Sequence, residues 1–257
     1  MQKNVILATP FKDAGMSTSR LLSVIIPCFN EAGTIEQIVR AVAKVQLPKG
    51  WRKEIIVVDD GSAAQTRDAL RRIETTQVPD EEVPLTVISK EKNEGKGSAI
   101  KAGLRRVCGE YIIIQDADLE YDPNDYAALL APIVDGRANS VFGSRTLQDN
   151  NVPYSAIYFY GGLLVTKLFN LAFGTHLTDI ATCYKVFSRK HIPALLASPH
   201  QDFVFDAMDI THVLATSGTV LEVPVRYSAR TKAGGKKLSW KHGAKIVFAI
   251  LKKRLTL

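Results

Sequence analysis

The chain has 257 residues, of which 46% are hydrophobic and 23% are charged, a globular composition that is sufficient for one large α/β domain. Its formal net charge is +7, but residues 226–257 contain ten Lys or Arg and no Asp or Glu, which leaves −3 on the rest of the chain. Three cysteines lie far apart without metal-ligand spacing, which argues against a disulfide framework and a zinc site and favours a reducing compartment.

The two ends of the chain differ in character. The first twenty residues lack the basic-then-apolar layout of a signal peptide, and we expect residues 1–20 to be a disordered leader. We assign residues 21–230 to one catalytic domain and residues 231–257 to a basic amphipathic segment. No uninterrupted apolar run reaches the roughly 18 to 20 residues of a transmembrane helix.

Strand and helix patterns alternate through the first 145 residues. Short β-branched apolar runs predict buried strands, and apolar residues at helical spacing predict amphipathic helices, beginning with a possible capping box of Thr34 and Gln37. The predicted strands lie within 21–30, 54–62, 84–90, 110–118 and 140–145, and the predicted helices within 33–45, 65–74, 98–107 and 125–136. This alternation predicts a mostly parallel sheet with helices on both faces.

The pattern is less regular after about residue 145. Residues 154–174 are apolar on most sides but are interrupted by Gly161, Gly162, Lys167 and Asn170. Residues 209–218 have helical spacing. Residues 220–230 resemble an edge strand, the position where a proline is tolerated.

Acidic side chains follow the strand predicted in "EYIIIQDADLEYDP", at residues 110–123. Asp116, Asp118 and Glu120 come where that strand ends, and ligands of parallel sheets bind at the carboxyl ends of strands. Carboxylates at this spacing can hold Mg²⁺ or Mn²⁺ together with phosphate oxygens. A polar turn is the alternative, and it accounts well for Asp122, which precedes Pro123 as a helix N-cap.

Eight segments, in the same order along the chain, give this sequence a family resemblance. It resembles the GT-A fold glycosyltransferases of family 2, and most of all the polyprenyl-phosphate glycosyltransferases, the group that includes dolichol-phosphate mannose synthases. The segments are "SVIIPCFNEAGTIEQIV", "EIIVVDDGS", "KNEGKGSAIKAGL", "GEYIIIQDADLEYDP", "FGSR", "LTDIATCYKVF", "LEVPVRYSAR" and "GGKKLSWKHG". They cover residues 23–243, and that extent makes the signal specific.

The resemblance implies a GT-A fold and the transfer of a sugar from a nucleotide-sugar to a polyprenyl (dolichyl or undecaprenyl) phosphate, with inversion at the anomeric carbon. GDP-mannose, UDP-glucose and UDP-N-acetylglucosamine all remain compatible donors. The cofactor would be Mg²⁺ or Mn²⁺, held by Asp116, Asp118 and Glu120. The acceptor is already an anion at neutral pH, so the reaction needs little help from a general base.

The resemblance also assigns roles to other residues. Base and ribose would contact Pro27, Phe29, Glu31 and Asp59, and Asp116 would lie near the ribose and diphosphate. Phosphates would be gripped by Lys96, Arg145, Lys185, Arg226, Arg230 and Lys236. Asp118, Arg145 and Asp179 would be catalytic, although Asp179 could equally cap a helix after Thr178. We expect "LTDIATCYKVF", at residues 177–187, to be that helix.

A polyprenyl acceptor requires contact with a bilayer. Residues 154–173 and 241–255 are candidates for amphipathic helices that lie in the membrane interface, with lysines available to lipid headgroups. For the first stretch an ordinary core helix fits about as well. We therefore expect a cytoplasmic protein bound peripherally to the cytoplasmic face of a membrane.

Four alternatives remain at this stage. One is a degenerate transferase that binds lipid without turnover, because Cys183 and Lys185 stand where the family usually has Gly and Arg. "GKGSAI" follows a strand and opens a helix as in NAD(P)-binding oxidoreductases, but Ile100 occupies the third glycine position. An RNA-binding module would use the basic tail, yet the chain has no aromatic RNA motif, and we expect no nucleic-acid partner. A family 2 glycosyltransferase with a non-lipid acceptor is the nearest competitor.

Overall fold

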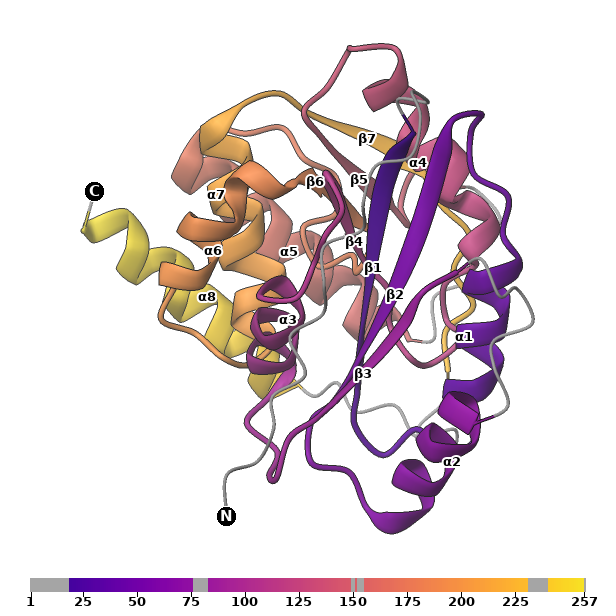
Figure 1. The fold of residues 1–257 in the computed structure, drawn as a ribbon. Coiled ribbons are helices and arrows are strands. Elements are labelled where there is room, and N and C mark those ends of the chain that lie inside the picture. The colour runs from indigo at the N-terminus through magenta and orange to yellow at the C-terminus, as the bar shows by residue number, and fades with distance from the viewer. Residues whose placement is uncertain (1–18, 76–82, 149–150, 152–154, 231–239, 257) are drawn as a thin grey trace.

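The computed structural model describes residues 19–75, 83–148, 151, 155–230 and 240–256, and these form one sheet covered by helices (Figure 1). Within them seven strands have the order β3-β2-β1-β4-β6-β5-β7. The strands are β1 (Arg20–Cys28), β2 (Trp51–Asp59), β3 (Leu85–Ser89), β4 (Tyr111–Ile114), β5 (Ser140–Ser144), β6 (Lys185–Ser188) and β7 (Val220–Pro224). Only β6 runs antiparallel to its neighbours, β4 and β5.

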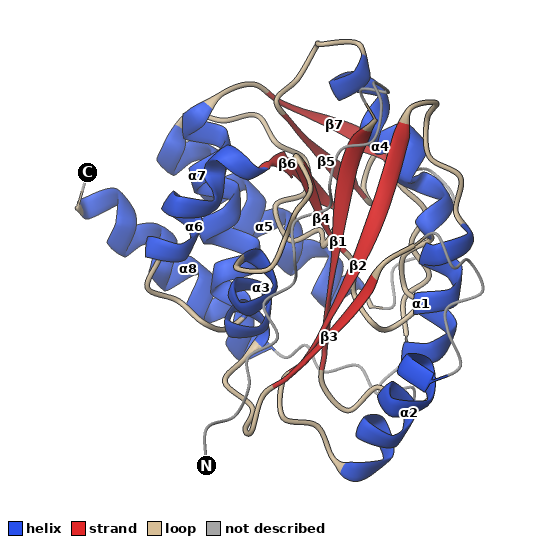
Figure 2. Cartoon of the chain, viewed as in Figure 1, coloured by secondary structure: helices blue, strands red, loops and turns tan. Residues whose placement is uncertain are grey.

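Helices cover both faces of this sheet, as Figure 2 shows. The helices are α1 (Ile35–Lys44), α2 (Ala64–Thr75), α3 (Lys96–Leu104), α4 (Tyr126–Val134), α5 (Ala156–Phe173), α6 (Ile192–Ala197), α7 (Ile210–Ser217) and α8 (Trp240–Leu255). Helices α1, α2 and α4 lie on one side of the sheet and the others lie on the opposite side (Figure 1). The predicted parallel α/β architecture is therefore confirmed.

The core explains why the strands read as continuous apolar runs. Val24, Ile25 and Ile26 of β1 are fully buried, as are Ile112 and Ile113 of β4, because helices pack on both faces of the central strands. Parallel pairing of β1 with β2 and β4 brings the ends of these strands to the same edge. The polar turns that follow them meet at that edge.

Two local predictions were wrong. Residues 177–187 do not form a helix: the chain turns through Thr178 and Asp179 and enters strand β6 at Lys185. Thr34 does precede α1, but its side chain bonds to Glu31 rather than forming a capping box. The prediction of an edge strand is confirmed, because β7 pairs with β5 alone, and Asp122 caps the short helix Pro123–Asp125 as expected.

Helices α5 and α8 pack against each other and leave apolar side chains exposed. Helix α5 has 18 residues and a mean hydropathy of 1.4, and 17% of it is buried. By length and composition it is the one described helix that qualifies to cross a membrane. From the sequence we expected no apolar segment of transmembrane length, because Gly161 and Gly162 interrupt the run. In the structure both glycines lie within α5, and the helix as a whole remains apolar.

Glu54 of β2 supports a buried hydrogen-bond network, and its removal should destabilise the fold. Its carboxylate accepts hydrogen bonds from the Ser23 hydroxyl and from the backbone N–H groups of Cys108 and Gly109. Glu54→Ala removes the acceptor of the buried Ser23 hydroxyl and of the part-buried Cys108 N–H, while the Gly109 N–H keeps its hydrogen bond to the Ser23 hydroxyl. We therefore expect the free energy of unfolding to fall by about 3 kcal/mol. Urea denaturation followed by circular dichroism measures the change. The exposed Glu74→Ala on α2 is the control, and an equal effect of both changes would refute the role of Glu54.

Candidate active site

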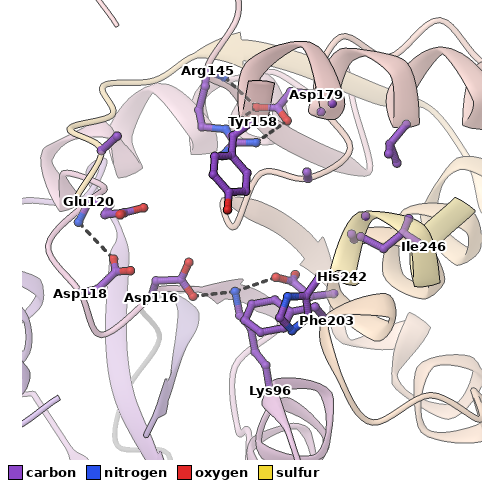
Figure 3. Close-up of a pocket in the computed structure, with 18 of the residues that line it drawn as sticks. Lys96, Asp116, Asp118, Glu120, Arg145, Tyr158, Asp179, Phe203, His242 and Ile246 are labelled. Carbon is purple, nitrogen blue, oxygen red and sulfur yellow. Dashed lines mark hydrogen bonds and ion pairs between the residues drawn. The ribbon is translucent and has the colours of Figure 1, made fainter. Parts of the chain in front are cut away.

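A cavity of about 1240 Å³ lies at the carboxyl edge of the sheet. Residues that follow β1 and β4 form one end of it, the start of α3 and the segment around Asp206 form another wall, and α5 and α8 extend it away from the sheet. Figure 3 shows charged side chains at the sheet end, with His242 and Ile246 of α8 at the other. The cavity thus joins a charged end to an apolar channel.

Four carboxylates gather at the sheet end, and we call Glu31, Asp116, Asp118 and Glu120 the acidic corner. All four line the cavity. Leu119 adopts a left-handed backbone conformation with φ of 58°, which costs a non-glycine residue energy and is typical of functional turns. In this turn the Asp118 carboxylate accepts a hydrogen bond from the Glu120 N–H at 3.1 Å.

The acidic corner carries more negative charge than its own cations neutralise. Burial, followed by the charges of Asp116 and Glu120, raises the pKa of Asp118 to about 7, although Arg230 opposes the shift. Carboxylates that repel each other in a buried site favour either a proton or an added cation. The corner is therefore electrostatically prepared for a cation.

Arg230 contacts three of the four carboxylates of the acidic corner. Its guanidinium donates to both Glu31 oxygens at 3.0 and 3.1 Å and to Asp118 at 2.8 Å. Its backbone N–H and the Tyr227 hydroxyl bind the two oxygens of Glu120, at 2.8 and 2.5 Å. The segment after β7 is thus fastened to the corner by side chains and backbone.

Lys96, the first residue of α3, joins Asp116 to the opposite wall. Its ammonium lies 2.6 Å from Asp116 and 2.7 Å from Asp206. Burial disfavours the charge of Lys96, but these two carboxylates raise its pKa well above the ordinary value. A Cβ on Gly97 would lie 2.5 Å from Phe205 Cβ, so this glycine is what allows α3 to approach the π-helix Phe205–Asp209.

Arg145 and Asp179 form a second ion pair in the cavity wall. The Arg145 guanidinium donates to both Asp179 oxygens at 2.7 and 2.8 Å, and it also lies 5.1 Å from the centre of the Tyr227 ring. Glu222 of β7 accepts hydrogen bonds from the Thr178 and Asp179 N–H groups and so supports the turn. Asp179 therefore holds Arg145 instead of capping a helix.

The residues present fit a divalent cation such as Mg²⁺ or Mn²⁺. The corner offers oxygen ligands alone, which is the donor set that these ions prefer. Among the described residues no group of three His, Cys, Asp or Glu is arranged to hold a metal ion, and Lys96 and Arg230 engage Asp116 and Asp118. A bound metal would take Asp118 together with Asp116 or Glu120.

The structure brings most of the predicted site residues together. Those that line the cavity are Pro27, Phe29, Glu31, Lys96, Asp116, Asp118, Glu120, Arg145, Asp179 and Arg230. Asp59 lies beneath it, fully buried, where it accepts a hydrogen bond from the Ser62 N–H, and Asp60 faces the cavity instead. Lys236 lies outside the described residues.

Two predicted phosphate ligands are directed elsewhere. Lys185 is fully buried in β6, where it donates to the Thr182 carbonyl and contacts Asp206 at 3.4 Å. Arg226 forms ion pairs with Asp122 and Asp125 and does not line the cavity. The structure therefore does not bring these two side chains to the site.

Sequence reasoning missed Asp206 and Tyr227. Asp206 is ionised in spite of its burial, because Lys185 and Lys96 lower its pKa. It occupies a π-helix, a distortion that is frequent at functional sites but has no simple sequence signature. Tyr227 belongs to the segment "YSAR", which also contains the predicted site residue Arg230. This closeness in sequence to Arg230 was the one signal that could have predicted Tyr227 as a site residue.

Solved structures share this fold. Glucosyl-3-phosphoglycerate synthase from Mycobacterium tuberculosis, in complex with Mn²⁺, UDP and phosphoglyceric acid, has a TM-score of 0.66 at 18% identity, covering 95% of this chain and 84% of that one. The same protein with Mg²⁺ and UDP gives a TM-score of 0.63 at 17% identity, covering 95% and 85%. At these identities the likeness shows the fold alone.

A curated relative is more similar in sequence. The undecaprenyl-phosphate 4-deoxy-4-formamido-L-arabinose transferase of Shewanella sediminis (strain HAW-EB3) is 26% identical over 175 residues, which are 68% of this chain and 50% of that protein. The match thus spans half of the relative's length. The profile described as glycosyl transferase family 2 matches residues 23–196, which include the whole acidic corner but not its partners Arg230 and Tyr227. The chain belongs to glycosyl transferase family 2.

Proposed function

We propose that this protein transfers a hexose, mannose or a glucose-type sugar, from a nucleotide-sugar to a polyprenyl phosphate, with inversion and with a divalent metal. The observation that carries the proposal is the single cavity that joins the acidic corner to an apolar channel between α5 and α8. A nucleoside diphosphate and a metal suit the first end. A lipid-linked phosphate suits the second.

The donor would bind at the sheet end of the cavity. Pro27 lies near the end of β1, and Phe29 and Glu31 follow that strand. Asn30, in the same turn, accepts a hydrogen bond from the Ala63 N–H and so joins this turn to the one after β2. The metal would neutralise the charge that develops on the departing diphosphate. Asp118 would hold the metal, and Arg230, whose guanidinium lies 2.8 Å from Asp118, would be available to a phosphate oxygen.

The acceptor phosphate would lie between the acidic corner and Arg145. Arg145 extends into the cavity from the end of β5, and Asp179 fixes its guanidinium through two hydrogen bonds. A positioned guanidinium can hold a phosphate and direct one oxygen to the anomeric carbon. Asp179 is then a positioning residue, since it acts through Arg145.

The polyprenyl chain would leave along α5 and α8 towards a membrane. Ile157 and Leu164 of α5 and Trp240 of α8 line the cavity and are also 80%, 58% and 73% exposed. Phe248 and Leu251 continue the exposed apolar surface, and α8 ends with Lys252, Lys253 and Arg254. Such a surface suits a helix pair that lies on the cytoplasmic face of an anionic membrane.

The named relatives support different parts of this proposal. The Shewanella protein is named for undecaprenyl phosphate. One Mycobacterium structure holds Mn²⁺, UDP and phosphoglyceric acid, and the other holds Mg²⁺ and UDP. A small acidic acceptor would leave the apolar channel without a role, so we prefer the lipid. Incubation with radiolabelled GDP-mannose, UDP-glucose or UDP-N-acetylglucosamine, together with either acceptor, distinguishes the two by the phase that takes up the label.

Asp118→Asn should abolish transfer while leaving the protein folded. The change removes the proposed ligand of the metal. A metal that acts as a Lewis acid stabilises the transition state by several kcal/mol, so we expect kcat to fall by about three orders of magnitude. Label in the organic phase measures turnover with polyprenyl phosphate. Asp122→Asn, in the same turn but outside the cavity, is the matched control and should retain activity. Normal turnover by Asp118→Asn would refute the metal assignment.

The metal-free protein should lose stability as the pH rises towards 8, because of Asp118. Its pKa is about 7 in the folded protein, above the ordinary value of 3.8, so the folded state holds the extra proton in that window. The stabilisation of the folded state that this proton provides is complete below pH 4 and is lost as the pH rises through 7. Relative to Asp118→Asn, the wild-type free energy of unfolding should fall by about 2 kcal/mol between pH 5 and pH 8. Urea denaturation at each pH measures it, and parallel pH profiles would contradict the shift.

Binding to vesicles should depend on the cations that end α8. Basic residues near an anionic surface contribute about 1 kcal/mol each, so the exposed pair Lys252→Gln and Arg254→Gln should weaken binding about thirtyfold. Sedimentation with phosphatidylglycerol vesicles at low salt measures this. The pair Arg71→Gln and Arg72→Gln on α2 removes equal charge from the opposite side of the sheet and should have little effect. Equal losses from both pairs would argue against α8 as the contact surface.

A further inference from the structure

Each Lys and Arg that lines the cavity in the described part of the chain is held by carboxylates. Lys96 lies between Asp116 and Asp206, and Arg145 is fixed by Asp179. Lys96 thus engages one candidate ligand of the metal, Asp116, whereas Arg230 engages two, Asp118 and Glu120. The protein's own cation and the metal therefore compete for the same oxygens.

The geometry makes simultaneous occupation unfavourable. The guanidinium of Arg230 contacts Glu31 and Asp118 within 3.1 Å, and its Nε lies 3.6 Å from Glu120. Its side chain is 18% exposed, so the charge is embedded in the corner rather than spread over the surface. A divalent ion on Asp118 would lie within a few ångströms of this guanidinium, where like charges repel strongly in a partly buried site.

The backbone around Arg230 limits how the conflict can be resolved. The Ser228 N–H donates to the Glu120 carbonyl, Tyr121 and Tyr227 form a β-bridge, and the Arg226 N–H donates to Asp125. These contacts anchor residues 226–228 to the turn that carries the acidic corner. A long side chain at position 230 can then change partners while the segment before it stays in place.

We propose that Arg230 is an internal counter-cation of the metal site, which occupies the acidic corner in the donor-free protein and exchanges its carboxylates for donor phosphates when the metal enters. The inference rests on the proposed function, since it needs a metal and a diphosphate at this corner. The exchange conserves charge pairing, because the metal takes Asp118 while the guanidinium takes a phosphate oxygen. Metal and nucleotide consequently bind cooperatively.

The exchange also sets an order of events. Without nucleotide, the metal has to displace Arg230 into solvent, where the guanidinium loses its three carboxylate partners, Glu31, Asp118 and Glu120. With nucleotide, the diphosphate supplies new partners for the same guanidinium. The free protein should therefore hold metal weakly, and the nucleotide should strengthen metal binding beyond its own chelation of the ion.

Mn²⁺ binding without sugar or lipid tests this directly. The loss of the free Mn²⁺ signal in electron paramagnetic resonance gives the affinity of the wild type, of Arg230→Gln and of Arg226→Gln, each alone and with UDP or GDP. Arg230→Gln should bind Mn²⁺ alone about tenfold more tightly than the wild type, within the usual range of site coupling. The extra tightening that the nucleotide gives in the wild type should shrink by a similar factor.

Arg226→Gln is the matched control, because it removes the same charge four residues earlier from a side chain that does not line the cavity. It should bind Mn²⁺ like the wild type. The double change Asp118→Asn and Arg230→Gln should lose the gain, which locates the ion at the acidic corner. If Arg230→Gln binds Mn²⁺ no more tightly than the wild type, or if Arg226→Gln gains equally, the proposal is overturned.

A second variant covers the case in which Arg230→Gln does not fold. Arg230→Lys keeps one charge but cannot hold Glu31 and Asp118 together as the planar guanidinium does, so it should show a smaller gain in Mn²⁺ affinity. No gain would count against the exchange. A protein that shows the exchange but labels no lipid would refute the proposed acceptor and leave the counter-cation role intact.

Discussion

The site depends on one constraint, the concentration of buried carboxylates at the end of β4. These carboxylates repel one another, and the cations of the protein that contact them are too few to neutralise their charge. The effect of this excess negative charge is clearest at Asp118, whose pKa is raised to about 7 although Arg230 lies 2.8 Å away. Two segments from distant parts of the chain supply cations to the corner, Lys96 from the start of α3 and Arg230 from the segment after β7. Folding of the cavity is thus linked to the same charges that suit a metal and a diphosphate.

The parallel sheet explains how residues so far apart meet. Pairing of β1 with β2 and β4 aligns their carboxyl ends. Strand β6 is antiparallel to both β4 and β5, and β7 is parallel to β5, so β5 and β7 end at the same edge as β4. This places Arg145 opposite the acidic corner, with Tyr227 between them contacting both Arg145 and Glu120. One aromatic side chain therefore connects the two halves of the site.

The second feature is the pair of helices that leaves apolar surface uncovered. Soluble proteins seldom expose several large apolar side chains on adjacent turns, and such patches mark contact surfaces. Here the patch adjoins the cavity, because Ile157, Leu164 and Trp240 belong to both. One cavity therefore extends from the acidic corner to an apolar surface that suits contact with lipid. This continuity is the reason for preferring a polyprenyl phosphate to a small acceptor.

The sequence by itself determined the α/β alternation, the strand ends at which polar residues gather, and the family, because periodicity and local motifs are encoded within short segments. Partners distant in sequence required the tertiary structure. Lys185 and Arg226 were assigned to phosphates by motif position, yet the antiparallel course of β6 buries the first against Asp206, and Asp122 and Asp125 hold the second. Asp206 had no local signal, since only the approach of α3 to a π-helix brings it to Lys96. Which cation faces which carboxylate is decided by packing, and neither spacing nor composition records it.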